Sequence, residues 1–282
     1  MTIGIIGLGL IGGSMAKAVK SRTAHRVFAF DRDPAVLNAA LTERVCDGVL
    51  ERAQLKACEI VLVALWPDDT VQFVKQNADA FAPGSIVSDL CGVKGFVCRG
   101  VRDAVLRRDF TFVGAHPMAG RERSGFESAS AELFDRASML LTPFPGTPRE
   151  EIEKLSDFYR TLGFARILET TAEEHDRVIA YTSQLAHIVS SAYVKSPTVE
   201  EHHGFSAGSY RDMTRVARLN EDMWTELFLE NRAPLKSELD ALIARLRVFS
   251  QALGENDAGT LRSLLREGRT TKERIDAEDD GY

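Results

Sequence analysis

The stretch Ile3-Gly4-Ile5-Ile6-Gly7-Leu8-Gly9-Leu10-Ile11-Gly12 near the amino terminus decides the fold. Its first four residues are typical of a buried strand, and the glycines that follow have the pattern G-x-G-x-x-G. Residues 14–20 then have helical character, so the pattern joins a strand to a helix, which is the context in which it binds a dinucleotide. The first glycine allows a tight turn, the second lets a pyrophosphate approach the backbone, and the third lets helix and strand pack closely.

The expected cofactor contacts come from this segment and from a few later side chains. The free N–H groups at the start of a helix bind phosphate oxygens. Asp31 ends the next predicted strand, where a carboxylate can accept a hydrogen bond from a ribose hydroxyl and repel a 2′-phosphate. NAD is therefore favoured, while the adjacent Arg32 leaves NADP possible, and a purely structural glycine turn is the simpler alternative. The predicted cofactor-binding residues are Gly7, Leu8, Gly9, Leu10, Ile11, Gly12, Ser14, Asp31 and Arg32.

Short apolar runs alternate with helical stretches through the first half of the chain. The runs at 3–6, 27–30, 60–65, 85–88 and 112–114 are apolar almost throughout, which is typical of parallel strands buried on both faces. Asp33-Pro34 supplies an N-cap and a first helical proline for one of the intervening helices. Two further strands, at 138–142 and 165–168, enclose a helix near 149–162. This alternation predicts a Rossmann-type, doubly wound α/β domain over residues 1–170.

From about Thr171 the pattern changes to long helical periodicity, which predicts an all-helical domain over residues 171–282. One stripe follows heptad spacing and consists of Leu235, Leu239, Leu242, Leu246, Phe249 and Leu253. Such a stripe can pack inside one helical domain, or it can form an interface with a second copy of the chain. Both interpretations are open at this point.

Composition excludes several classes of protein. The chain has 282 residues, of which 44% are hydrophobic and 27% charged, as in ordinary globular proteins. Its net charge of −6 argues against a general nucleic-acid or anionic-membrane binder. No apolar run approaches the roughly 18 residues of a membrane helix, and the first residues lack the basic start of a signal peptide. We therefore expect a cytoplasmic protein.

The four cysteines, Cys46, Cys58, Cys91 and Cys98, form no C-x-x-C pair and have no histidine at zinc-ligand spacing. Free thiols in a reducing compartment are expected, and no metal site.

His116 is the candidate for acid–base chemistry. It lies in His116-Pro117-Met118-Ala119-Gly120, directly after a predicted strand, where ligands of open α/β sheets bind. Histidine titrates near neutrality and can take a hydroxyl proton as a hydride leaves the same carbon. A structural histidine in a constrained loop is the alternative.

Two pairs in the helical half have a spacing of four, which places each pair on one helix face. The pairs are Ser183 with His187 and Arg211 with Arg215. Two guanidinium groups on one face can bind carboxylates in bidentate fashion, or they can form a solvated ion-pair face. Trp224 follows a predicted N-cap and is either a core residue or a ligand contact. His25 and His175 have no evident partners.

In their order along the chain, these motifs resemble the prephenate dehydrogenase family of tyrosine biosynthesis. The resemblance rests on the glycine segment 7–14, His116–Gly120, 183–187 (Ser-Gln-Leu-Ala-His), 212–217 (Asp-Met-Thr-Arg-Val-Ala) and Met223-Trp224. It implies an NAD-dependent oxidoreductase that converts prephenate to 4-hydroxyphenylpyruvate by oxidative decarboxylation, as part of aromatic amino acid biosynthesis. It also implies a helical domain that forms a homodimer.

The resemblance further implies roles for individual residues. His116 matches the catalytic histidine, and Arg215 matches the arginine that holds the ring carboxylate. The positions near the side-chain end of the substrate match His187, Arg211 and Trp224, and an acidic residue at the pocket entrance matches Glu122.

Two alternatives to a prephenate substrate are open. Arogenate would make the chain a cyclohexadienyl or arogenate dehydrogenase. Another dehydrogenase of the β-hydroxyacid type would need a catalytic lysine in the helical domain, where Lys195 is the nearest candidate.

The chain departs from the family pattern at one position. Gly92 stands where the family often has a serine that orients the catalytic histidine and the substrate hydroxyl. Cys91, Ser88 or a water molecule are the candidates to replace that hydroxyl.

Overall fold

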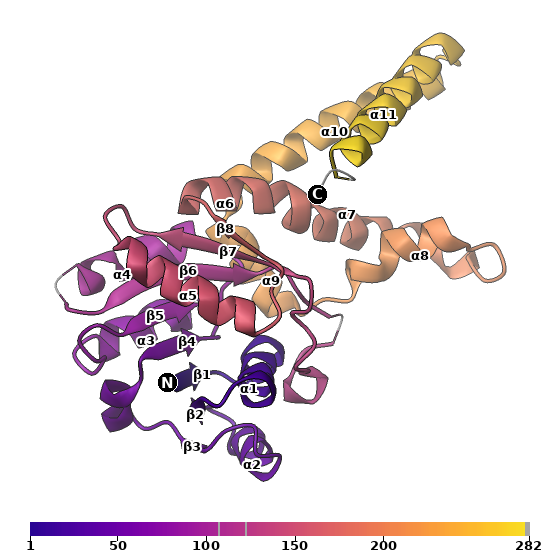
Figure 1. Cartoon of the computed structure of the whole chain (residues 1–282). Coiled ribbons are helices and arrows are strands. Elements are labelled where there is room, and N and C mark those ends of the chain that lie inside the picture. Colours follow the sequence, from indigo (N-terminus) through magenta and orange to yellow (C-terminus); the bar gives the residue numbers. More distant parts are fainter. Residues whose placement is uncertain (107, 122, 280–282) are drawn as a thin grey trace. The chain divides into compact units, whose positions relative to one another are not determined.

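The computed structural model describes residues 1–106, 108–121 and 123–279 (Figure 1). The chain divides into two compact units, Met1–Arg232 and Ala233–Tyr282. The predicted domain boundary between residues 170 and 171 lies inside the first unit, where Thr171 caps a helix by accepting from the Glu174 N–H. This boundary stays a prediction.

One sheet forms the centre of the first unit, with the strand order β3-β2-β1-β4-β5-β6-β7-β8. All neighbouring strands are parallel except β6 and β7, which confirms the doubly wound prediction. The strands are β1 (Thr2–Ile6), β2 (Arg26–Phe30), β3 (Gly48–Val49), β4 (Ile60–Val63), β5 (Ile86–Asp89), β6 (Thr111–Pro117), β7 (Ser138–Pro143) and β8 (Arg166–Glu169). The order reverses between β1 and β4, and ligands of open α/β sheets bind at such a switch point.

Helices cover both faces of the sheet (Figure 1). Alternate residues of β4 show why, since Ile60 and Leu62 belong to one apolar cluster and Val61 and Val63 to the other. The first cluster includes residues of α1 (Leu10–Arg22), α2 (Pro34–Thr42) and α5 (Arg149–Thr161). The second includes residues of η1 (Arg52–Ala57), α3 (Pro67–Asn77) and α4 (Gly95–Val105). The predicted cap of α2 is confirmed, because the Asp33 side chain accepts from the Ala35 N–H and Pro34 is the first helical residue.

Two features of the sheet were not predicted. Strand β3 is only two residues long, too short for a periodic pattern. Strands β6 and β7 are antiparallel, and the described part of the connection between them holds only the short η2 (Phe126–Ser128). A parallel pair would need a longer crossover, usually an α-helix.

The helical part of the first unit follows β8. Its elements are α6 (Ala172–Ile179), the π-helical η3 (Ala180–Gln184), α7 (Leu185–Tyr193), η4 (Pro197–Glu201), α8 (Gly208–Thr214), η5 (Arg215–Ala217) and α9 (Glu221–Glu230). The buried Asn231 links the end of α9 to α6 and η3. Its amide donates to the Asp176 carbonyl at 2.8 Å and to Gln184 Oε1 at 2.7 Å. A π-helical turn inside a helix often marks a functional site.

The second unit consists of the helices α10 (Arg232–Gly254), which begins at the last residue of the first unit, and α11 (Ala258–Asp279). In the turn between them Asn256 has a φ of +53°, and Asp257 accepts from the Thr260 N–H. Leu246 and Leu253 of the predicted stripe are 56% and 67% exposed. These two positions of the stripe are therefore uncovered, whereas Leu235 at its start is buried.

All four cysteines are free and buried, as predicted. No helix among the described residues is long and apolar enough to cross a membrane.

Candidate active site

The glycine segment forms a tight turn between β1 and α1. Gly7 has a φ of +84°, and a Cβ there would lie 2.5 Å from the Ala64 carbonyl oxygen. A Cβ on Gly12 would collide with the Gly7 carbonyl oxygen. A Cβ on Gly9 would have no atom within 4 Å, so this glycine borders open space. The turn therefore fits a diphosphate that approaches Gly9 at the start of α1.

Asp31 fastens this turn to the end of β2. Its Oδ2 accepts from the Leu8 N–H at 2.7 Å and its Oδ1 from the Asp33 N–H at 2.9 Å. Each carboxylate oxygen has a further lone pair for a hydroxyl donor. Arg32 is exposed beside it. Ser14, by contrast, is fully buried, and its Oγ accepts from the Ser130 N–H at 3.0 Å.

A cavity of about 380 Å³ opens beside this turn, at the carboxyl ends of β1, β2 and β3. It has no local sequence pattern, because its lining comes from separate strand ends and from η1 and α3; Phe30 and Val49, at two of the strand ends, are exposed. Its walls are mostly apolar and consist of Ile6, Phe30, Val49, Leu50, Glu51, Arg52, Leu55, Phe73 and Asn77.

His116 is the second-last residue of β6, and it pairs with Leu140 of β7. Its Nδ1 is in hydrogen-bond contact with His175 Nε2 at 2.9 Å. Burial holds the pKa of His116 well below its ordinary value, and the nearby His175 and Lys94 lower it further. The ring is therefore neutral near pH 7 and able to accept a proton.

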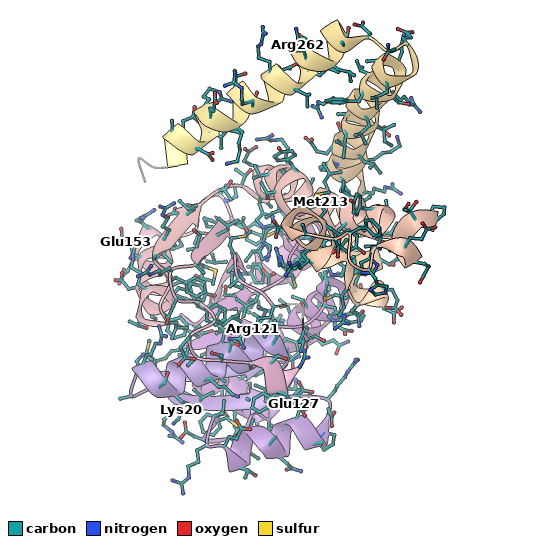
Figure 2. All side chains as sticks on the ribbon, turned by 90° about the vertical axis from the view of Figure 1, so that its right-hand side faces the viewer. Lys20, Arg121, Glu127, Glu153, Met213 and Arg262 are labelled. Carbon is teal, nitrogen blue, oxygen red and sulfur yellow. The ribbon has the colours of Figure 1, made fainter. Side chains whose placement is uncertain are left out.

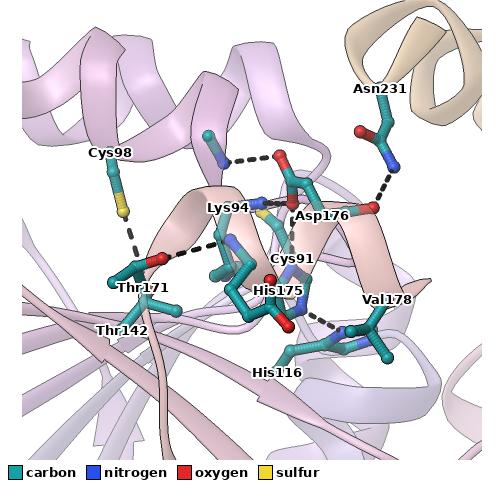
Figure 3. A network of polar contacts seen from close by, with 12 residues as sticks. Cys91, Lys94, Cys98, His116, Thr142, Thr171, His175, Asp176, Val178 and Asn231 are labelled. Atoms are coloured by element: carbon teal, nitrogen blue, oxygen red, sulfur yellow. Dashed lines mark hydrogen bonds and ion pairs between the residues drawn. The ribbon is translucent and has the colours of Figure 1, made fainter. Parts of the chain in front are cut away.

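His175 connects His116 to a carboxylate (Figure 3). The buried His175 donates from Nδ1 to Asp176 Oδ1 at 2.8 Å. Asp176 also accepts from the backbone N–H groups of Lys94 and Gly95, each at 2.8 Å. The expectation that His175 has no partners was wrong. A histidine next to an aspartate, His175-Asp176, is the sequence feature that could have indicated such a pair. Its contact with His116 could not be predicted, because the two histidines are 59 residues apart in the sequence.

Lys94 also binds the end of β6. Its fully buried ammonium pairs with Asp89 and donates to the Ala115 carbonyl at 2.6 Å, one residue before His116. Lys94 therefore contributes its backbone to the Asp176 contact and its side chain to the strand that carries His116.

His187 and Trp224 lie together in the helical part of the unit. Their rings stack with centroids 3.8 Å apart, and His187 Nδ1 donates to the Ser183 carbonyl at 3.0 Å. Burial lowers the pKa of His187 against the effect of that hydrogen bond, and the charge of Arg215 lowers it further. Three of the predicted substrate residues, His187, Trp224 and Arg215, are thus neighbours.

Arg211 and Arg215 keep the predicted helical spacing, because the Arg215 N–H donates to the Arg211 carbonyl at the end of α8. Both side chains are exposed. The N-cap that precedes Trp224 is confirmed, since the Asn220 side chain accepts from the Met223 N–H. Glu122 lies outside the described residues.

An arginine-lined hollow of about 380 Å³ lies between the β6–β7 connection and the segment after η5. Arg121 and Glu127 are labelled on this face in Figure 2. The lining residues are Arg121, Arg123, Glu127, Ser128 and Arg218. A positive hollow of this kind attracts anions.

Comparison with known proteins identifies the family. Residues 15–168 match the model of the prephenate dehydrogenase nucleotide-binding domain, and residues 171–267 match that of the prephenate dehydrogenase dimerization domain. The chain belongs to the prephenate dehydrogenase family. It is therefore an NAD-dependent oxidoreductase with a Rossmann-type nucleotide-binding domain.

Relatives of this family match the chain over nearly its whole length. It is 32% identical to the cyclohexadienyl dehydrogenase of Zymomonas mobilis over 96% of this chain and 94% of that protein. It is 30% identical to the prephenate dehydrogenase of Bacillus subtilis over 96% of this chain and 74% of that protein. A solved prephenate dehydrogenase from Aquifex aeolicus, in complex with hydroxyphenyl propionate and NAD+, has the same fold. It has a TM-score of 0.86 and 24% identity and covers 98% of each chain.

In this chain Gly92 stands where the family resemblance implies a serine. It lies next to His116, the catalytic candidate. A Cβ on Gly92 would be 3.9 Å from His116 Nε2 and 3.5 Å from Leu227 Cδ2. The position thus has room for a small side chain directed at the His116 ring.

The two side chains considered as replacements for that serine are engaged with other groups. Cys91 Sγ is in contact with Thr70 Oγ1 at 3.3 Å and with the Leu65 carbonyl at 3.4 Å. Ser88 Oγ donates to the Val113 carbonyl at 2.9 Å and accepts from Tyr159 at 3.0 Å. Because Cys91 and Ser88 are both engaged, a water molecule is the remaining candidate to replace the serine hydroxyl.

Proposed function

We propose that this chain oxidises and decarboxylates prephenate to 4-hydroxyphenylpyruvate with NAD+. The observation that carries the proposal is the neutral His116 at the carboxyl end of β6, with Nδ1 engaged by His175 and Nε2 beside the open position of Gly92. When bound, NAD+ supplies the hydride acceptor.

His116 acts at the carbinol carbon of the substrate. Its Nε2 accepts the hydroxyl proton as the hydrogen on C4 leaves as a hydride. The bond between the ring and its carboxylate then breaks, CO2 departs, and the electron pair makes the ring aromatic. The phenol oxygen regains the proton, so the sum is prephenate and NAD+ giving 4-hydroxyphenylpyruvate, CO2 and NADH.

The cofactor contacts follow from the glycine turn and the cavity beside it. The diphosphate would lie against the Gly9 backbone at the start of α1, and the Asp31 carboxylate would accept from the adenosine ribose. The apolar cavity next to Phe30 has the position and size for the adenine ring. These placements keep the predicted preference for NAD over NADP.

The substrate carboxylates need cationic partners. Arg215 would bind the ring carboxylate, while Arg211, His187 and Trp224 would surround the side-chain end. The arginine-lined hollow would raise the local concentration of this dianion before it reaches the site.

A homodimer is the proposed assembly. The match to the family's dimerization domain covers residues 171–267, and uncovered apolar side chains lie on α10 and α11, among them Leu246, Leu253 and Leu265. Light scattering during gel filtration would give the mass of a dimer, whereas a monomer mass at micromolar concentration would contradict this assembly. We also propose a cytoplasmic location, which fits four free thiols.

The activity is tested by mixing purified protein with prephenate and NAD+ and following NADH absorbance. We expect rapid NADH formation, with 4-hydroxyphenylpyruvate as the product and a lower rate with NADP+. Absence of NADH from folded protein that binds NAD+ would refute prephenate as the substrate.

Arogenate is the second candidate, and one contact favours it. Because His187 Nδ1 donates to the Ser183 carbonyl, the neutral ring offers Nε2 as an acceptor at the side-chain end. An acceptor suits the ammonium group of arogenate better than the keto oxygen of prephenate. The relative from Zymomonas mobilis is named cyclohexadienyl dehydrogenase. Comparing kcat/KM for the two substrates in wild type and His187→Ala decides this, since arogenate use should fall more than prephenate use if His187 binds the ammonium.

A further inference from the structure

We propose that His175 and Asp176 form a relay that sets the tautomer of His116 and stabilises its protonated form. This inference rests on the proposed function, because it assigns the two residues to the base that the reaction uses. His175 is a positioning residue in this scheme, since it contacts His116 rather than the substrate.

The tautomers follow from the direction of each hydrogen bond. Both oxygens of Asp176 accept from backbone N–H groups, Oδ1 from Lys94 and Oδ2 from Gly95, so the carboxylate is the acceptor in this cluster (Figure 3). The proton between His175 and Asp176 therefore belongs to His175 Nδ1. A neutral His175 then has its lone pair on Nε2, the atom that faces His116.

The same logic continues to His116. Since His175 Nε2 can only accept, the 2.9 Å contact requires a proton on His116 Nδ1. The remaining lone pair of His116 is then on Nε2, which is the nitrogen 3.9 Å from the Cβ position of Gly92. The carboxylate thus determines, through two rings, which nitrogen of His116 serves as the base.

The relay also matters during the reaction. When His116 Nε2 takes a proton, the ring becomes an imidazolium in a buried setting, which is costly without a partner. The Nδ1–H bond to His175 strengthens at that moment, and the Asp176 carboxylate compensates the charge through His175. In the serine proteases an aspartate performs these two tasks directly for the histidine base, without a second histidine between them.

The surroundings hold the relay in place. His175 is 2% exposed, and Asp176 is connected to the start of α4 by two backbone hydrogen bonds. The Asn231 amide binds the Asp176 carbonyl, and the Lys94 ammonium binds the Ala115 carbonyl next to His116. Both ends of the relay are therefore fixed by separate elements, as a preorganised site requires.

Two substitutions at position 175 separate the relay from simple packing. His175→Leu removes both hydrogen bonds, whereas His175→Gln keeps an amide oxygen that can accept from His116 Nδ1. We expect kcat to fall about 100-fold in His175→Leu and about 10-fold in His175→Gln. KM for prephenate and the Kd of NAD+ should stay within about threefold, because His175 is 2% exposed and both of its ring nitrogens are engaged by His116 and Asp176. His25→Leu, a histidine far along the sheet that packs on Phe158, is the matched control and should keep full kcat.

Nitrogen NMR of histidine-labelled protein without substrate gives a second, activity-independent readout. We expect His116 to carry its proton on Nδ1 in wild type and to shift toward the Nε2–H tautomer in His175→Leu. A wild-type His116 protonated on Nε2 would overturn the relay, and so would a kcat for His175→Leu within about threefold of wild type. If wild type oxidises neither prephenate nor arogenate, the proposed function fails, while the NMR tautomer still decides the relay.

Discussion

The two ends of the candidate site are built in different ways. The reaction end, His116 with His175, Asp176 and Lys94, is joined by hydrogen bonds to β5, β6, α4 and α6, and most of its side chains are buried. The recognition end, with Arg211, Arg215, His187 and Trp224, lies on α7, α8, η5 and α9, where both arginine side chains are exposed. Proton transfer needs fixed geometry, whereas binding a carboxylate tolerates adjustment. Substitutions at the first end should therefore change kcat, and those at the second should change KM.

The largest effect is expected from His116→Asn. Loss of the base should lower kcat by about 10²–10⁴, with KM and NAD+ affinity nearly unchanged. Steady-state kinetics and titration calorimetry measure these quantities. Near-normal turnover would remove His116 from the mechanism and with it the division between the two ends.

Arg215→Gln should weaken the recognition end. Loss of a charged contact to the ring carboxylate should cost on the order of 2–4 kcal/mol in kcat/KM, or about 30- to 700-fold, mostly through KM. Lys236→Gln, which removes an exposed cation from a helix of the second unit, is the charge-matched control. Unchanged KM and kcat in Arg215→Gln would place this side chain outside the site.

The pH dependence of kcat/KM should reflect the buried base. Burial and the neighbouring His175 and Lys94 hold the pKa of His116 well below its ordinary value of 6.5. Activity should therefore be level through neutrality and fall only below pH 6.5, about tenfold per pH unit beneath the lowered pKa. An acid limb centred above pH 6.5 would contradict a buried neutral base.

Stability should respond to acid for the same reason. The pKa of His175 is also lowered, first by burial, so the unfolded chain binds protons that the folded chain does not. The free energy of unfolding should then decrease as the pH falls below 6.5 toward the lowered values. Urea unfolding at a series of pH values measures this slope.

Gly92→Ser should raise kcat, because it adds a hydroxyl beside His116. The Cβ position is 3.9 Å from His116 Nε2, so a serine hydroxyl can reach the ring or the substrate hydroxyl. One added hydrogen bond should raise kcat by about two- to tenfold. Gly92→Ala adds the Cβ without the hydroxyl and should leave kcat unchanged. A fall in kcat for the serine variant alone would contradict a favourable hydrogen bond from a hydroxyl at this position.

The smallest effect is expected at the arginine-lined hollow. Arg218→Gln should raise KM for prephenate by about two- to threefold at low salt, with kcat unchanged, because the hollow acts by attraction at a distance. High salt should abolish the difference between the variant and wild type. A fall in kcat would instead place Arg218 at the reacting ring.

Local patterns allowed most of the first unit to be predicted. The strand–glycine–helix stretch at residues 3–12 and the caps at Asp33 and Asn220 are signals within a few residues, and the structure has them as expected. Strand β3 and the antiparallel pairing of β6 with β7 depend on contacts between distant segments. The hydrophobic pattern within each segment does not indicate which strand it pairs with or in which direction.

The same limit applies to the site. His116 was recognisable from its position at the predicted end of a strand, which the structure extends to Pro117, but its link to His175 and Asp176 arises only when α6 packs beside the end of β6. The cavity beside the glycine turn is formed by residues from several strand ends and helices, and the contacts of Ser88 and Cys91 depend on the packing of two apolar layers. Tertiary contacts of this kind have no local signature.

We propose that His116 accepts the proton during hydride loss and decarboxylation of prephenate, and product stoichiometry tests this role most directly. NADH and 4-hydroxyphenylpyruvate should appear in equal amounts when wild type is given prephenate and NAD+, and both should nearly vanish in folded, NAD+-binding His116→Asn. Equal rates in the variant and wild type, or NADH formation without 4-hydroxyphenylpyruvate, would contradict the account.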